Sequence, residues 1–144
     1  MPWVVDTCVI LEVAINDNQY GRNSAHCLEF YRNAGLLTCP VSVVELGPQF
    51  GDHVEQLSEF LRAMQFDASE SWLREDTDKS IVAWSHQIDQ KRKGNNQKRP
   101  VADVLIGSFA MRFEGLISRN PDHFKKTFPK LRIIVPQSKR KTSL

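Results

Sequence analysis

Residues 99–111 read RPVADVLIGSFAM, a segment that is apolar on nearly every side once it has passed Pro100. Proline suits the first turn of a helix, where a missing N–H group costs no hydrogen bond, so the sequence predicts a helix over residues 100–113. A helix with so few polar positions must be covered over most of its surface. We therefore expect it to be central and buried, with Asp103 as a charged exception in its first turn.

Short apolar runs elsewhere predict strands, and each run ends at a polar residue or a proline. They span residues 3–5, 36–39, 115–118 and 131–135. Helical patterns occur between them, over residues 24–33 and 42–50 and in two apolar stripes that begin at Val54 and at Leu73. The second of these segments begins with Ser42-x-x-Glu45, which resembles a capping box. Alternating strands and helices predict an α/β domain with a mainly parallel sheet.

Length and composition restrict the class of protein. A chain of 144 residues that is 41% hydrophobic and 25% charged predicts one globular domain, over residues 1–136, followed by a basic, flexible tail at 137–144. No apolar run approaches the roughly 18 residues that span a bilayer, and Asp6 interrupts an N-terminus that has no basic region, so we expect a cytoplasmic protein without membrane contact. Three widely spaced cysteines predict free thiols: Cys8, Cys27 and Cys39.

The net charge of +2 hides an asymmetry between the two ends of the chain. Residues 1–90 carry 5 Lys and Arg against 14 Asp and Glu, whereas residues 91–144 carry 14 against 3. The second portion therefore has a charge of +11, and it includes a predicted basic loop, KRKGNNQKR, at residues 91–99. This charge predicts a polyanionic ligand such as a nucleic acid, unless the two portions neutralise each other in the fold.

Acidic side chains follow the predicted strands at positions that converge on one edge of the sheet. Asp6 follows the first strand, Glu45 and Asp103 lie in the first turns of their helices, and Asn120 and Asp122 follow the strand over 115–118. Each position also has a simpler role, as a helix cap, a charge on a helix dipole or a turn residue. Those roles leave the convergence unexplained.

Convergent carboxylates repel one another unless a cation lies among them. A set of oxygen donors, without histidines or cysteines at zinc-like spacing, favours Mg²⁺ or Mn²⁺ over Zn²⁺. An acidic metal pocket beside a basic segment suits a phosphodiester substrate, which a metal-activated water would hydrolyse.

Four sequence segments resemble, in order and spacing, the acidic motifs of PIN-domain ribonucleases, and most closely those of VapC-type toxins from toxin–antitoxin pairs. They are VVDTCVIL at 4–11, CPVSVVELG at 39–47, RPVADVLIGSFAM at 99–111, and LISRNPDHF at 116–124, which is followed by LRIIVP at 131–136. The resemblance implies a three-layer α/β/α sandwich with a parallel sheet of four or five strands. It also implies Mg²⁺- or Mn²⁺-dependent RNA cleavage, a homodimer, and a small antitoxin whose tail occupies the acidic groove.

The resemblance assigns metal-binding, catalytic roles to Asp6, Glu45 and Asp103, and supporting roles to the hydroxyls of Thr7 and Ser118. The alternative is a catalytically silent PIN-like domain that binds RNA or a protein.

The fourth acidic position departs from the family pattern T-R-N-x-x-D-F. In an alignment on Phe124, His123 takes the place of the usual aspartate and Asp122 lies one residue early. Either Asp122 serves as the fourth metal-binding acid, which we favour, or Asn120 holds the site through its amide oxygen or a water. The candidates for holding RNA phosphates are Arg92, Lys98, Arg99 and Arg119.

Overall fold

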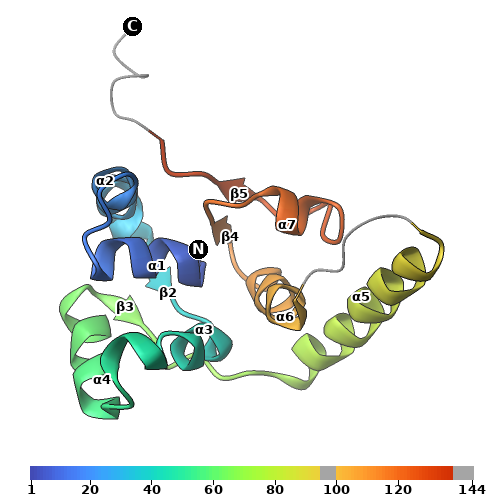
Figure 1. The fold of residues 1–144 in the computed structure, drawn as a ribbon, viewed down its shortest axis with the longest axis horizontal. Coiled ribbons are helices and arrows are strands. Elements are labelled where there is room, and N and C mark those ends of the chain that lie inside the picture. The colour runs from blue at the N-terminus through green and yellow to red at the C-terminus, as the bar shows by residue number, and fades with distance from the viewer. Residues whose placement is uncertain (95–99, 138–144) are drawn as a thin grey trace, which may run out of the picture.

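The computed structural model describes residues 1–94 and 100–137 (Figure 1). Two candidate phosphate-binding residues, Lys98 and Arg99, lie outside these ranges, as does the predicted tail from residue 138 onward. Among the described residues, no helix is both long and apolar enough to cross a membrane. All three cysteines are free thiols, as predicted.

The described residues form a five-stranded sheet in the order β3-β2-β1-β4-β5. The strands are β1 (Trp3–Val5), β2 (Leu36–Leu37), β3 (Phe66–Asp67), β4 (Gly115–Ile117) and β5 (Ile133–Ile134). Every pairing between neighbours is parallel, so the carboxyl ends of all the strands meet at one edge. The predicted parallel sheet is therefore confirmed, with β3 as a strand that the sequence pattern did not indicate.

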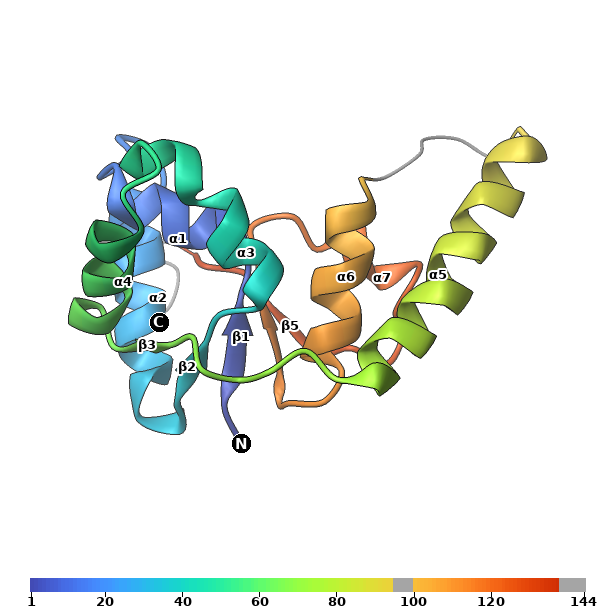
Figure 2. The same ribbon diagram turned by 90° about the horizontal axis from the view of Figure 1, so that it is seen from below.

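Seven α-helices accompany these strands in the described residues. They are α1 (Thr7–Ala14), α2 (Gly21–Tyr31), α3 (Pro40–Glu45), α4 (Val54–Ala63), α5 (Arg74–Arg92), α6 (Val101–Ala110) and α7 (Asp122–Lys125). Short 3₁₀ helices follow α2 and α3, at Arg32–Ala34 and Gly47–Phe50. The crossover helices place the sheet between two helical layers, with α1, α2 and α4 on one side and α5 and α6 on the other (Figure 2).

Alternate residues of each strand face opposite layers, because successive side chains of a strand point to opposite faces. In β1, Val5 packs into the core formed with α1, α2 and α4, whereas Val4 packs into the core formed with α5, α6 and α7. Helix α3 contributes to both cores, through Val43 and Val41 respectively. The three-layer α/β/α sandwich implied by the sequence is therefore the observed architecture.

The central helix α6 is buried along its last seven residues apart from Leu105. Its Gly107 packs so closely on the ring of Phe128 that a Cβ atom there would lie 2.3 Å from a ring carbon. The predicted buried helix is confirmed, although it ends at Ala110 rather than near residue 113.

Several other sequence-predicted boundaries are displaced, including those of the helix expected over residues 24–33, which is observed at Gly21–Tyr31. The helix expected from Ser42 begins at Pro40, and Ser42 is buried inside it without a capping role, because the N-cap residue is Cys39. The basic loop expected from Lys91 begins later, because Lys91 and Arg92 are the last residues of α5. Proline suits the first turn of a helix, so α3 can begin at Pro40, and the exposed Lys91 and Arg92 favour the last turn of α5, where basic side chains interact well with the helix dipole.

Candidate functional site

Three candidate carboxylates lie at the carboxyl edge of the sheet, as predicted. Asp6 directly follows β1, and Asp103 lies in the first turn of α6, which runs antiparallel to the strands and so begins at this edge. Glu45 is the last residue of α3 rather than a residue of its first turn, because that helix begins at Pro40. The charges of all three influence one another, so the fold brings them together.

Asp6 is the most enclosed of these carboxylates, with 6% of its surface exposed. Its Oδ2 accepts a hydrogen bond of 2.7 Å from the Ser118 hydroxyl at the end of β4, and the Cys8 thiol lies 3.5 Å away. Burial raises the pKa of Asp6, against the opposing hydrogen bonds, and the charge of Glu45 raises it further. The carboxylate is therefore fixed in position but poorly solvated.

Glu45 is exposed and is held by the Thr7 hydroxyl. Thr7 Oγ1 donates a hydrogen bond of 2.6 Å to Glu45 Oε1 and lies 2.8 Å from the Ser42 hydroxyl. Thr7 and Ser118, which the sequence suggested as supporting hydroxyls, thus each contact one candidate carboxylate. Ser42 is an additional contact that the sequence analysis interpreted as a helix cap.

Asp103 is partly buried beside the imidazole of His123. The Nδ1 atom of His123 lies 3.1 Å from Asp103 Oδ2, an atom that solvent does not reach. Burial and the charge of Asp6 raise the pKa of Asp103, and the nearby His123 partly offsets this. His123 is a site residue that the sequence analysis did not select, although its alignment with the usual aspartate was the available signal.

The fourth acidic position differs from the other three. Asp122 is exposed in the first turn of α7, and within residues 1–94 and 100–137 its carboxylate makes no hydrogen bond or ion pair with the other candidates. Asn120 lies closer to them, since its N–H donates to Ser118 Oγ (3.0 Å) and its Nδ2 lies 3.8 Å from Cys8 Sγ. The structure therefore places His123, rather than Asp122, beside a candidate carboxylate, and it places Asn120 beside two residues that contact Asp6.

Arg119 makes a structural network and does not fit its predicted role of holding RNA phosphate. Its guanidinium donates to Glu12 (3.3 Å), Ser24 (2.8 Å) and the backbone oxygen of Pro136 (2.7 Å), and lies over the ring of Tyr20. These contacts connect α1, α2 and the segment after β5. The side chain is 16% exposed, so little of its charge is offered to a ligand.

Arg92 is exposed at the end of α5 and remains a candidate for contacting phosphate. The remaining two cationic candidates, Lys98 and Arg99, lie outside the described residues.

The donor chemistry of the site suits a divalent cation, although no ready-made cluster is present. Within residues 1–94 and 100–137, no three His, Cys, Asp or Glu side chains are arranged to hold a metal ion. Each candidate carboxylate is held instead by its own neighbour. Nevertheless, burial raises the pKa values of Asp6 and Asp103, the charge of Asp6 raises the pKa of Asp103 further, and the charge of Glu45 raises both. A bound cation would offset these effects. Carboxylate oxygens are also the donors that Mg²⁺ and Mn²⁺ prefer.

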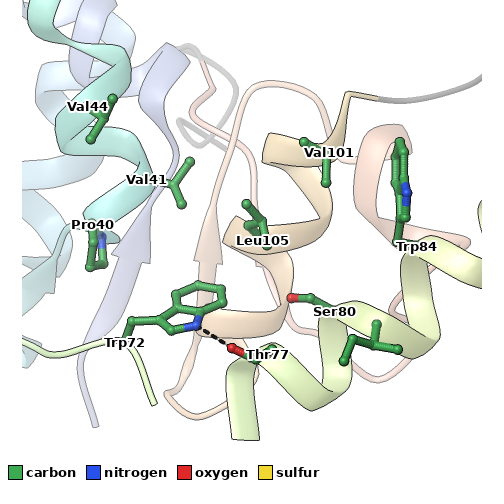
Figure 3. Close-up of a pocket in the computed structure, with 10 residues that line it drawn as sticks. Pro40, Val41, Val44, Trp72, Thr77, Ser80, Trp84, Val101 and Leu105 are labelled. Atoms are coloured by element: carbon green, nitrogen blue, oxygen red, sulfur yellow. Dashed lines mark hydrogen bonds between the residues drawn. The ribbon is translucent and has the colours of Figure 1, made fainter. Parts of the chain in front are cut away.

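An apolar groove of about 540 Å³ lies between α3, α5 and α6 (Figure 3). The side chains that line it are Pro40, Val41, Val44, Trp72, Thr77, Ser80, Ile81, Trp84, Val101 and Leu105. The Trp72 indole donates a hydrogen bond of 2.8 Å to Thr77 Oγ1, which satisfies the polar edge of that ring. Helices α3 and α6 thus contribute to the carboxylate site and to the groove.

Comparisons with known proteins support the fold. No family model matches the chain, and no curated protein matches it. The chain is similar to a solved structure described as VapBC2 from Rickettsia felis bound to a DNA fragment from their promoter. The match has a TM-score of 0.64 at 16% identity and covers 95% of this chain and 100% of the other. The chain therefore has the PIN-like fold that its acidic motifs suggested.

Proposed function

We propose that the protein is a cytoplasmic, divalent-cation-dependent endoribonuclease, the toxin of a VapBC-type toxin–antitoxin pair. The observation that carries the proposal is the convergence of Asp6, Glu45 and Asp103 at the carboxyl edge of the sheet, where their charges influence one another. The similarity in fold to VapBC2 supports it. The predicted substrate is RNA, and the predicted cofactor is Mg²⁺ or Mn²⁺.

The chain's own side chains would prepare the site for phosphodiester hydrolysis. Asp6, Glu45 and Asp103 would hold the ion, which supplies a water of lowered pKa and stabilises charge on the phosphoryl oxygens. The Ser118 and Thr7 hydroxyls fix the orientations of Asp6 and Glu45 through their hydrogen bonds. Arg92, Lys98 and Arg99 are the cations proposed to hold the RNA backbone.

Cation dependence is the first expected result. Purified protein should cut an end-labelled, structured RNA in the presence of Mg²⁺ or Mn²⁺, stop when excess EDTA is added, and resume when the ion is restored, because the carboxylates alone supply no activated water. Gel electrophoresis of the labelled products measures the rate. Cleavage that continues at full rate in EDTA would contradict the proposal.

The alternative function is a catalytically silent PIN-like domain that binds RNA or a protein. The exposed position of Asp122 and the lack of a ready-made metal cluster in the described residues favour it. Such a domain should bind RNA with an affinity that falls steeply as salt rises, and should show no turnover with any divalent ion. The same labelled RNA, followed by filter binding and by gel, separates the two functions.

We also propose a homodimer as the assembly and a small antitoxin as the protein partner, with a segment in the apolar groove beside the acidic edge where the resemblance places its tail. The solved neighbour is described as VapBC2 bound to a DNA fragment from their promoter, which supports an antitoxin partner. The groove exposes apolar side chains, with Val44 at 77%, Ile81 at 55% and Val101 at 47%. Val44 precedes Glu45 and Val101 lies two residues before Asp103, so a segment in the groove would lie beside the candidate site.

Charged substitutions in the groove should weaken antitoxin binding by about ten- to a hundredfold, because a buried apolar anchor contributes roughly 1–3 kcal/mol to an interface. The test is Ile81→Glu, with binding to the protein encoded by the adjacent reading frame measured by calorimetry. Val82→Glu is the matched control, since Val82 neighbours Ile81 on α5 but lines a different cavity. If Ile81→Glu instead dissociates a dimer and leaves antitoxin binding unchanged, a second copy occupies the groove.

A further inference from the structure

The imidazole of His123 is placed against a candidate metal-binding carboxylate. Its Nδ1 lies 3.1 Å from Asp103 Oδ2, and the two side chains are 32% and 18% exposed. Both groups are therefore partly enclosed at the carboxyl edge of the sheet. Asp122, the neighbouring acid, is exposed and has no such contact within the described residues.

Local structure fixes His123 in this position. The backbone N–H of His123 donates to Asn120 O (3.0 Å), and the next residue, Phe124, is fully buried in the core beneath α6. The N–H of Phe128 donates in turn to Phe124 O (2.8 Å). With Phe124 anchored in the core, the first turn of α7 presents His123 to Asp103 and leaves Asp122 exposed.

Two observations fit neighbouring ligands on one ion, namely the separation of the two groups and the absence of a hydrogen-bond partner for the buried Asp103 Oδ2 within the described residues. Two donors bound at about 2.1 Å and at right angles to each other are about 3.0 Å apart. The 3.1 Å between His123 Nδ1 and Asp103 Oδ2 matches this spacing.

We propose that His123 supplies a nitrogen ligand next to Asp103 and that the cation site therefore selects Mn²⁺ over Mg²⁺. This inference rests on the proposed function, since it concerns the same ion. Mg²⁺ prefers oxygen ligands in a strict octahedron, whereas first-row transition ions accept imidazole nitrogen readily. His123 takes the place of the aspartate in the family pattern. In this proposal it changes which ion the site prefers, and it does not simply remove one ligand.

The direct test is pulsed electron paramagnetic resonance of Mn²⁺ bound to the purified full-length protein. Coupling of the Mn²⁺ spin to an imidazole ¹⁴N nucleus is expected in the wild type, and the signal should change in protein labelled with [¹⁵N]histidine. Coupling should disappear in His123→Asp and persist in Asp122→Asn, the matched exposed neighbour. The labelled wild-type protein shows that an imidazole binds the ion, and His123→Gln assigns the coupling to His123 if His123→Asp folds poorly.

Competition between ions gives a second readout that does not depend on catalysis. The affinity for Mn²⁺ relative to Mg²⁺ should fall at least about tenfold in His123→Asp, the smallest change typical when a group that tunes a metal site is altered. It should be unchanged in Asp122→Asn. Mn²⁺ binding without nitrogen coupling, or with an unchanged ion preference in His123→Asp, overturns this inference alone. If the protein binds neither ion, both this inference and the proposed cation-dependent function are wrong.

Discussion

Asp103→Asn is expected to lower the rate of RNA cleavage by about a hundredfold or more, because the change removes a charged ligand from the site where charge develops in the reaction. An amide keeps the shape of the side chain and one oxygen, but it holds a cation less strongly. Single-turnover cleavage of a labelled RNA at saturating Mn²⁺ measures the effect.

The same variant should be as stable as the wild type, or more stable. Burial raises the pKa of Asp103 in the folded protein, so its ionisation at pH 7 opposes folding, and this cost is present above the raised pKa and absent well below the unfolded value. Asparagine carries no charge at any pH. Thermal unfolding at pH 7 therefore separates a lost catalytic group from a damaged fold.

Asp122→Asn is the matched control, because it makes the same chemical change at an exposed position in the first turn of α7. It should reduce cleavage by less than Asp103→Asn does. Equal losses in the two variants would restore Asp122 as the fourth metal-binding acid. Full activity in Asp103→Asn would indicate a contaminating nuclease and contradict the assigned site.

Asp76→Ala is expected to destabilise the protein by about 3–5 kcal/mol, the cost of leaving one member of a buried ion pair without its partner. Asp76 is 0% exposed, and its two oxygens each accept a hydrogen bond of 2.9 Å from Arg112. Asp76 also accepts from the N–H of Leu73 and so caps α5, while Arg112 lies over the rings of Phe109 and Phe113. The ion pair between Asp76 and Arg112 thus connects the start of α5 to the segment that follows α6.

Chemical denaturation of Asp76→Ala and Asp78→Ala measures this effect with a control on the same helix. Asp78 pairs with Arg74 at 3.0 Å, but both side chains are exposed, so its loss should cost no more than about 1 kcal/mol. The double variant Asp76→Ala with Arg112→Met should lose less free energy of unfolding than the two single variants lose together, because it leaves no unpaired charge. Similar losses at Asp76 and Asp78 would disprove the structural role of this pair.

The sequence predicted most of the fold because its strands and its central helix carry strong local patterns. The apolar run over β1 and the nearly all-apolar surface of α6 require burial wherever they lie, so their presence could be inferred without coordinates. Three elements were not predicted, and the four-residue helix α7 is one of them. The two residues of β3 carry no periodicity of their own and become a strand by pairing with β2, and the apolar run of α1 follows β1 without a pattern that separates helix from strand.

The sequence also selected the acids that the structure brings together, although it did not anticipate the side chains that contact them. The acids Asp6, Glu45 and Asp103 follow from the rule that parallel strands collect side chains at one edge. Their partners depend on contacts between segments far apart in the chain, such as Ser118 with Asp6 and His123 with Asp103. For the same reason the sequence could not show that Arg119, predicted to bind RNA phosphate, donates hydrogen bonds to Glu12 and Ser24 instead.

By itself, the sequence determined the α/β class, the buried position of α6 and the carboxylates that the sheet collects, because burial and strand direction are imposed by local pattern and topology. Only the tertiary structure decided which side chain of α7 reaches Asp103, that Arg119 is a structural residue and that Asp76 joins α5 to α6. Each of these outcomes depends on the angle at which a packed element presents its side chains. That angle is set by core residues such as Phe124, whose contacts lie on other elements.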